Sequence, residues 1–312
     1  MARGRPPILD LLQSRKERLV CRDLVLRAIR RVFHQMKFVE VETPLLLSTV
    51  APEEHIVPVR CGKGVLATSP ELQMKELMAA GFDRIFQIGR SFREGERGKR
   101  HVPEFTILEW YRKARTLDSL RLDLERLLSA AARQVPGDLR VVWRGHRVDF
   151  APPYRVVTVR DAFLQHAGWD PVEHFDADRF DIDLVERVEP HLGRGRPEIL
   201  AFYPLPQASL ARLCPEDPRV ALRLELYVEG LELANGFMEL SDPVVQRCRF
   251  LESAQAIRRA GRRPLPFPST FVAALPFLPD CVGIALGVDR LVMLLTDAAD
   301  IDQVRAFAPG EA

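Results

Sequence analysis

The sequence has few features of an exported or membrane-embedded protein. It contains only five cysteines among 312 residues, and no two of them form a CxxC pair. An odd number of widely spaced cysteines argues against both a disulfide framework and a zinc site. No stretch reaches the roughly 18 consecutive apolar residues of a membrane-spanning helix, and the N-terminus has no apolar core of signal-peptide length. We therefore expect a protein of the reducing cytoplasm that binds no membrane.

The chain also lacks an excess of charge of either sign. Its 45 basic and 43 acidic residues are interspersed and give a formal net charge of +2. Such a balance does not indicate nucleic-acid or membrane binding by charge alone, so a polyanionic ligand must be bound at a local site. A hydrophobic content of 47% suffices for one large core. We expect an N-terminal arm over residues 1–19 and a single domain over residues 20–312.

The order of periodic segments predicts an α+β domain built on an antiparallel sheet. Helices are indicated at residues 20–37, 116–135 and 246–262 by apolar residues at helical spacing, the second of these with Thr116 as its cap. A further helix within residues 66–82 would start at Ser69 and Pro70 and end at Gly81. Strands are indicated at residues 84–93 and 103–111, joined by a charged loop, and on both sides of a turn at Glu229 and Gly230. Residues 283–297 pass from small residues into an apolar helix. Residues 136–200 carry scattered proline, glycine and charge and are interpreted as a variable insertion.

The turn at Glu229 and Gly230 predicts which residues of its two strands share a face. Tyr227 would pair with Glu232, and Glu225 with Ala234, which places all four on one face. Two neighbouring carboxylates repel each other and invite a cation. Mg²⁺ with a phosphate substrate fits, because this ion uses one or two carboxylates and takes its other ligands from water and phosphate.

Further along the second of these strands, polar and aromatic residues alternate. Asn235, Phe237 and Glu239 would lie on one face and offer an amide, an aromatic wall and a carboxylate. An acid beside an aromatic ring suits an ammonium group. This segment therefore predicts an amine-binding pocket.

The charged loop between residues 92 and 104 joins two strands that carry nucleotide-binding chemistry. Arg93 ends the first strand, and His101 precedes the second. An aromatic ring and a guanidinium at the same end suit a nucleotide, with the ring stacked on its base and the arginine on its phosphates. On the second strand, one face would carry Phe105, Ile107, Glu109 and Tyr111.

The order of these segments resembles the class II aminoacyl-tRNA synthetases, and among them the lysine branch. FVEVETPLL is similar to the first motif of that class, FRxxxxxxRHxPEFTxLEWY to the second and GIALGVDRLVML to the third. The resemblance covers most of the chain after residue 20. It implies an antiparallel sheet flanked by helices and a homodimer formed through the first motif.

The short arm before the first motif holds too little chain for an anticodon-binding barrel. With SPELQMKELMAAG, QASLA and ELANGFMELSD, the sequence resembles the lysine ligases that act on elongation factor P. Those enzymes activate lysine or β-lysine with ATP and transfer it to a lysine side chain of that translation factor. The resemblance therefore implies ATP and Mg²⁺ as cofactors, elongation factor P as partner, and no tRNA substrate.

The resemblance also implies a role for each matched position. The ATP site would comprise Arg93, Glu94, Gly95, His101, Val102, Phe105, Glu232, Leu233, Gly287 and Arg290. The amino-acid pocket would comprise Ser69, Pro70, Glu71, Tyr111, Asn235, Phe237 and Glu239. Glu71 would bind the proximal ammonium, and Tyr111 with Glu239 the distal one. Glu232 and Glu239 would bind Mg²⁺, and Arg93 and Arg290 would be catalytic because they neutralise charge on the phosphates.

Three positions depart from the pattern of the family. Gly95 stands where a glutamate is usual, with Glu94 and Glu96 as neighbours, and Val102 where an asparagine is common. Either the backbone replaces these contacts or a flanking acid does. Ala285 stands where synthetases often have glycine, and its methyl group at the floor of the site predicts a bias in substrate choice that Ala285→Gly would reveal.

Two other functions are compatible with the motifs. A tRNA-charging enzyme would need basic surface for an acceptor stem, which the sequence offers only around Arg3, Arg5, Arg15 and Lys16. A catalytically inactive paralogue that acts as sensor or assembly partner would have lost an arginine or a metal-binding acid. Arg93, Arg290, Glu232 and Glu239 are all present.

Overall fold

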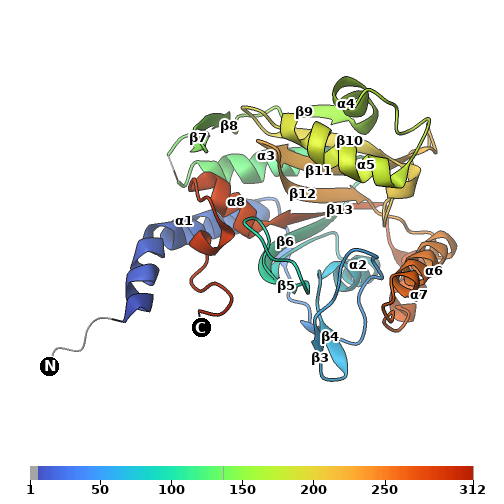
Figure 1. Cartoon of the computed structure of the whole chain (residues 1–312). Helices are drawn as coiled ribbons and strands as arrows, with labels where there is room; N and C mark the ends of the chain where they lie inside the picture. The colour runs from blue at the N-terminus through green and yellow to red at the C-terminus, as the bar shows by residue number, and fades with distance from the viewer. Residues whose placement is uncertain (1–5, 136, 312) are drawn as a thin grey trace.

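The computed structural model describes residues 6–135 and 137–311. Its centre is an eight-stranded sheet in the order β1-β5-β6-β13-β12-β11-β10-β9 (Figure 1). The inner pairs are antiparallel, and β1–β5 and β9–β10 at the two edges are parallel. The strands are β1 (Val39–Glu40), β5 (Arg84–Phe92), β6 (Glu104–Lys113), β9 (Arg155–Thr158), β10 (Glu198–Pro204), β11 (Val220–Val228), β12 (Leu231–Met238) and β13 (Cys281–Gly287). The predicted α+β fold with an antiparallel sheet is confirmed.

Two small sheets and eight α-helices complete the described structure. The small sheets are β2 (Leu46–Leu47), β4 (Gly64–Leu66) and β3 (Arg60–Cys61), and β7 (Arg140–Trp143) with β8 (His146–Asp149). The helices are α1 (Pro7–Gln35), α2 (Glu71–Ala79), α3 (Asp118–Ala132), α4 (Val159–His166), α5 (Ala177–Asp183), α6 (Pro243–Arg259), α7 (Ser269–Ala274) and α8 (Val288–Leu295). None of them is long and apolar enough to cross a membrane.

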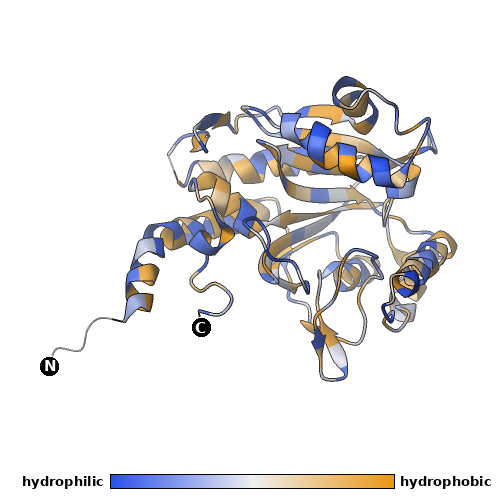
Figure 2. Cartoon of the chain, in the orientation of Figure 1, coloured by the Kyte–Doolittle hydropathy of each residue, from blue (hydrophilic) through white to orange (hydrophobic). Residues whose placement is uncertain are grey.

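The main core lies between one face of the sheet and helices α1, α3 and α8. Phe33 of α1 stacks on Phe86 of β5, with ring centroids 4.4 Å apart, and α8 contributes a nearly continuous apolar run. Figure 2 shows α8 as mostly apolar, whereas α5 and α6 alternate between apolar and polar residues. The opposite face of the sheet is covered by α4 and α5 over β9 to β11 and by α2, α6 and α7 near β5 and β6. Between these two groups of helices the sheet is open to a cavity.

Two predicted boundaries are wrong. Helix α1 begins at Pro7 rather than near residue 20, so most of the expected arm belongs to the same helix. The signal for its early start is Pro7 itself, which suits the first turn of a helix. Thr116 does not cap α3, because that helix begins at Asp118 and has no side-chain cap. The predicted insertion at residues 136–200 contains β9, which extends the main sheet through its pairing with β10.

The β11–β12 hairpin contains a bulge that the predicted register lacks. Glu229 and Gly230 form the turn with φ of 51° and 67°, as expected for a tight hairpin turn. Tyr227 pairs with Glu232 as predicted, but Leu226 pairs with Ala234 and Glu225 with Asn235. Leu233 is thus an extra residue on β12, and both it and Ala234 contribute to the core. The bulge places Asn235 on the face of Glu225 and Glu232, where Ala234 was predicted.

Candidate active site

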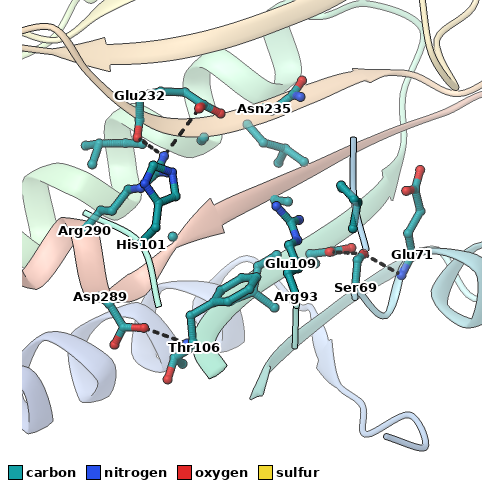
Figure 3. A pocket seen from close by; sticks show the side chains of 18 of the residues that line it. Ser69, Glu71, Arg93, His101, Thr106, Glu109, Glu232, Asn235, Asp289 and Arg290 are labelled. Carbon is teal, nitrogen blue, oxygen red and sulfur yellow. Dashed lines mark hydrogen bonds and ion pairs between the residues drawn. The ribbon is translucent and has the colours of Figure 1, made fainter. Parts of the chain in front are cut away.

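A cavity on the open face of the sheet gathers most of the predicted site residues (Figure 3). Its floor comes from β6, β12 and β13, and its walls come from the start of α2, the loop 93–102 and the start of α8. The predicted residues that line it are Ser69, Glu71, Arg93, His101, Val102, Phe105, Tyr111, Glu232, Leu233, Asn235, Phe237, Gly287 and Arg290. Four predicted residues are not part of its lining: Pro70, Glu94, Gly95 and Glu239.

Arg93 and Phe105 lie together at the start of the β5–β6 loop. The Arg93 guanidinium lies 5.0 Å from the centroid of the Phe105 ring, and its Nε donates to the carbonyl of Thr68 at 3.4 Å. Both side chains project into the cavity because Arg93 directly follows β5 and Phe105 is the second residue of β6. This arrangement offers a ring and a cation to one ligand, as the sequence predicts.

The loop after Arg93 shows which acid can replace the glutamate expected at Gly95. Gly95 has φ of +79°, a conformation that favours glycine, and it lies outside the cavity. Glu94 lines a neighbouring cavity instead, and its backbone amide donates to Val57. Glu96 lines the active-site cavity, with its carboxylate 3.6 Å from Arg93. Of the two flanking acids, Glu96 is therefore the one placed to contact a ligand.

At the other side of the same cavity, Arg290 is held by several acceptors. Its Nη1 donates to the carbonyl of Glu232 at 2.9 Å and lies 3.4 Å from the carboxylate of that residue. Its Nη2 contacts Nε2 of His101. Burial lowers the pKa of His101, and the charge of Arg290 lowers it further. A neutral imidazole can accept a hydrogen bond from Arg290 and orient it.

Asp289, which precedes Arg290, links three elements beneath the cavity. Its Oδ2 accepts from the backbone amide of Thr106 at 2.7 Å, and its Oδ1 pairs with Arg22 of α1 at 2.6 Å. Thr106 is the neighbour of Phe105 on β6. The buried carboxylate thus fixes α8 relative to the strand that carries Phe105. Nothing in the sequence distinguishes Asp289, because one acid at the start of an apolar helix is an ordinary feature.

The amino-acid end of the cavity is built from Ser69, Glu71, Glu109 and Tyr111. Oγ of Ser69 accepts from the amide of Glu71 at 3.0 Å, at the start of α2, and donates to Glu109. The hydroxyl of Tyr111 donates to the other oxygen of Glu109 at 3.2 Å. Burial raises the pKa of Glu109 to about 8, and the neighbouring Glu71 adds to this effect. Within the described residues Glu109 forms no ion pair, although the charge of Lys75 opposes the rise of its pKa. A substrate ammonium would supply a direct partner.

The predicted role of Glu239 does not match its surroundings. Glu239 is fully buried and its Oε2 pairs with the ammonium of Lys75 at 2.5 Å, while the same ammonium pairs with Glu71 at 2.5 Å. Burial by itself lowers the pKa of Lys75, but the two carboxylates raise it above its ordinary value. Lys75 lies 5.3 Å from the centroid of the Phe237 ring. The cation expected beside Glu239 and Phe237 is thus a side chain of the protein itself. Unlike Glu239, Glu109 lines the cavity.

Glu232 and Glu239 also cannot bind one magnesium ion between them. Glu239 lies seven positions after Glu232, just beyond the end of β12, which corresponds to roughly 20 Å in an extended strand. The neighbour of Glu232 is Glu225, across the hairpin, and together with burial it raises the pKa of Glu232. The hydroxyl of Tyr227 donates to Glu225 at 2.7 Å and lies 3.2 Å from Glu189. No group of three acids, histidines or cysteines among the described residues is arranged to hold a metal alone.

Several residues that line the active-site cavity are not predicted from the sequence. Glu53 comes from an irregular loop, and burial and Glu71 raise its pKa to about 7. Glu109 lies on the predicted face of β6 but was given no role. Ala285 lines the cavity and pairs with Glu109 across β13 and β6, so its methyl group lies at the floor of the site, as predicted. The alternation of β6 could have indicated Glu109, whereas nothing in the local pattern indicates Glu53.

The chain was compared with known families and proteins. The profile of the class II tRNA synthetases of the D, K and N type matches residues 3–310. A protein of Klebsiella pneumoniae strain 342 named elongation factor P–(R)-β-lysine ligase is 38% identical over 306 residues, which cover 93% of this chain and 94% of that protein. A protein of the same name from Yersinia enterocolitica is 36% identical over 339 residues, with 98% and 97% covered. The chain therefore belongs to the class II tRNA synthetases of the D, K and N type, and within them to the elongation factor P–(R)-β-lysine ligase family.

Proposed function

We propose that this protein activates lysine or β-lysine with ATP and transfers it to a lysine side chain of elongation factor P. The observation that carries this proposal is one cavity with cations at one side and, at the other, a buried carboxyl group that forms no ion pair within the described part of the chain. Arg93 and Arg290 suit the phosphates of ATP, and Glu109 suits the ammonium of an amino acid. The names of the relatives agree with this pairing of ligands.

The chemistry follows from this arrangement. A carboxylate oxygen of the amino acid attacks the α-phosphorus of ATP, a new P–O bond forms, and the bond to pyrophosphate breaks. Arg93 and Arg290 neutralise charge that spreads over the phosphates, and the pocket around Glu109 fixes the approach. The amine of the acceptor lysine then attacks the carbonyl carbon, loses a proton and expels AMP.

Magnesium fits the acids of the hairpin rather than the pair predicted from the sequence. Glu232 faces the cavity, and burial and the charge of Glu225 raise its pKa, an effect that a bound cation would offset. Glu225 already pairs with Arg223 at 2.6 Å, so Glu232 would be the main ligand. Mg²⁺ needs only one or two carboxylates when phosphates supply other ligands. When bound there, it would neutralise charge on the phosphates together with Arg290.

The alternative substrate, tRNA, has less support. Arg15, one of the basic residues of the N-terminal segment, is buried and pairs with Glu311 at 2.6 Å. Lys16 is exposed, and Arg3 and Arg5 lie outside the described residues. The inactive alternative is disfavoured because Arg93, Arg290 and Glu232 all line the cavity.

A homodimer formed through the first motif is part of the proposal. Its support is apolar surface on the edge strand β1 and on α1, where Val39 is 50% and Val20 52% exposed. Small-angle scattering should give the mass of two chains, and a monomeric mass would count against this part.

The activity is tested by lysine-dependent exchange of labelled pyrophosphate into ATP. We expect exchange with at least one isomer of lysine or β-lysine. The same reaction is then offered tRNA and elongation factor P as acceptors. Lack of exchange with every isomer would contradict the enzymatic proposal, and charging of tRNA in preference to the protein would contradict the proposed acceptor.

A further inference from the structure

A second cavity, of about 530 Å³, adjoins the active-site cavity. Its walls come from the loop 49–60, the C-terminal half of α6 and the proline-rich loop 261–268. Glu53 and Ile56 line both cavities, so the two share a wall. Of the residues predicted for the ATP site, Glu94 alone lines the second cavity, and no proposed step of the activation reaction uses it.

The inner surface of this cavity is apolar. Ile257 and Phe250 of α6 are buried at its floor, and Leu251 beside them is 42% exposed. Pro264, Pro266 and Pro268 line it from the facing loop. Proline fixes φ and offers no backbone donor, so this wall is rigid and presents mainly apolar surface.

The rim of the cavity is basic, and its charges are not neutralised. Four arginines line it: Arg60, Arg258, Arg262 and Arg263. Within the described residues none of the four forms an ion pair. Arg262 donates to the carbonyl of Glu54, and Arg60 donates to the carbonyl of Arg263 at 3.5 Å.

The two carboxylates that line the same cavity do not neutralise the arginines of the rim. Glu53 and Glu94 also line the cavity, but neither pairs with these arginines. Some arginines elsewhere on the surface do have carboxylate partners, as Arg219 has in Asp217 at 2.8 Å. The rim therefore offers guanidinium groups to an acidic partner.

We propose that this cavity binds the segment of the acceptor protein that flanks its modified lysine, through apolar and acidic residues of that segment. The inference rests on the proposed function. The acceptor amine must reach the adenylate in the first cavity, and a lysine side chain has only a four-carbon stem. The backbone that carries it must therefore lie close to the active-site cavity, and the second cavity adjoins that cavity through Glu53 and Ile56. An enclosed apolar floor suits side chains of a peptide and not the phosphates of RNA.

Charge reversal at the rim tests the proposal. In Arg258→Glu/Arg263→Glu, both exposed guanidinium groups are replaced, and neither lines the active-site cavity. We expect kcat/KM for elongation factor P to fall about tenfold or more, because rim charges govern encounter with a charged partner. Lysine-dependent pyrophosphate exchange should stay within about twofold of the wild type. Arg259→Glu is the matched control, since Arg259 is exposed on the same helix but does not line the cavity.

A second variant tests the apolar floor without changing charge. Leu251→Ser should raise KM for elongation factor P and leave exchange unchanged. Val244→Ser is its control, because Val244 is 69% exposed on the same helix, outside the cavity.

Salt should lower kcat/KM of the wild type for the acceptor more than that of the arginine double variant, because screening acts on the charges that the variant has lost.

The outcomes separate this inference from the proposed function. If the wild type modifies elongation factor P and the rim and floor variants do so equally well, the docking site is refuted while the function stands. If the wild type transfers nothing to the protein, the function fails and the inference fails with it. A loss confined to tRNA charging would assign the rim to RNA, and a change from dimer to monomer would assign it to a second copy of the chain. Either of these results overturns the proposal.

Discussion

Arg22 of helix α1 and Asp289 of helix α8 form a salt bridge of 2.6 Å, with side chains that are only 14% and 2% exposed. Asp289 also accepts from the amide of Thr106, and it immediately precedes Arg290. One ion pair thus connects the helix that precedes the first motif to the strand of Phe105 and to the arginine of the third motif. The second and third motifs, which lie far apart in the sequence, meet in this contact.

Removal of Arg22 should therefore destabilise the protein and weaken ATP binding. Arg22→Met leaves the carboxylate of Asp289 buried with Arg305 3.9 Å away as its remaining cation. We expect the free energy of unfolding to fall by about 3 kcal/mol, because a buried charge loses its partner, and KM for ATP to rise. Chemical denaturation and initial rates measure the two effects. Arg27→Met on the same helix removes an exposed pair with Asp23 and should cost less than about 1 kcal/mol; equal losses in both variants would refute the account.

Lys75 should be required for stability because it separates two carboxylates. Lys75→Met leaves Glu71 and Glu239 without a cation, and we expect a loss of about 3–5 kcal/mol in the free energy of unfolding. The double variant Lys75→Met/Glu239→Gln should recover part of this loss, since it removes one of the two charges. Additive losses in the double-mutant cycle would show that Lys75 and Glu239 do not interact. Lys113→Met, which breaks an exposed pair with Asp83, serves as control and should leave stability nearly unchanged.

Glu109 should make stability depend on pH. Burial raises its pKa to about 8, so in the folded protein it keeps a proton that the unfolded chain has already lost at neutral pH. Its contribution to stability is fully present below the ordinary pKa of glutamate and is lost as pH rises toward about 8. The free energy of unfolding of the wild type should therefore decrease relative to that of Glu109→Gln as pH rises from about 5 to about 8. This interval lies between the ordinary pKa of glutamate and the raised pKa of Glu109.

Denaturation at a series of pH values measures this difference, and comparison with Glu109→Gln removes the contributions of Glu53 and Glu239. Glu104→Gln removes a half-exposed carboxylate of the same strand and should keep the pH dependence of the wild type. Parallel curves for the wild type and Glu109→Gln would show that Glu109 is ionised in the folded protein. On the proposed function, Glu109→Gln should also raise KM for lysine, and Glu104→Gln should not.

Two glycines of β13 should respond differently to alanine. A Cβ at Gly283 would collide with the ring of Tyr111 and the carboxylate of Glu239, so Gly283→Ala should lower both stability and activity. At Gly287 a Cβ would meet only the side chain of Arg290, 3.6 Å away, which is ordinary contact. Gly287→Ala should keep the thermal midpoint of the wild type and raise KM for ATP, if the nucleotide lies against this backbone. An unchanged KM for ATP would place the nucleotide elsewhere.

The sequence predicts the strands of the site better than their register. The alternation of β6 indicates Phe105, Glu109 and Tyr111 on one face, because a strand has a period of two and its face is set by any one residue. On β12 the bulge at Leu233 breaks that rule. Leu233 and its neighbour Ala234 are both apolar, so the pattern gives no sign of the extra residue.

Other parts of the site depend on contacts between distant segments. Lys75 has the position of a surface charge on an amphipathic helix, and its burial follows only from the approach of Glu239, more than a hundred residues later. Glu53 reaches the cavity from an irregular loop, where no periodicity sets the direction of a side chain. The placement of such residues is set by tertiary contacts, and the local sequence pattern does not predict those contacts.

The most direct test of the account is one transfer reaction. The wild-type protein, ATP and Mg²⁺ are incubated with (R)-β-lysine or lysine and with equal concentrations of elongation factor P and tRNA, and both acceptors are analysed by intact mass. The account predicts that elongation factor P gains the mass of one lysyl or β-lysyl group on a lysine side chain, and that tRNA stays uncharged. Charged tRNA beside unmodified elongation factor P would contradict it.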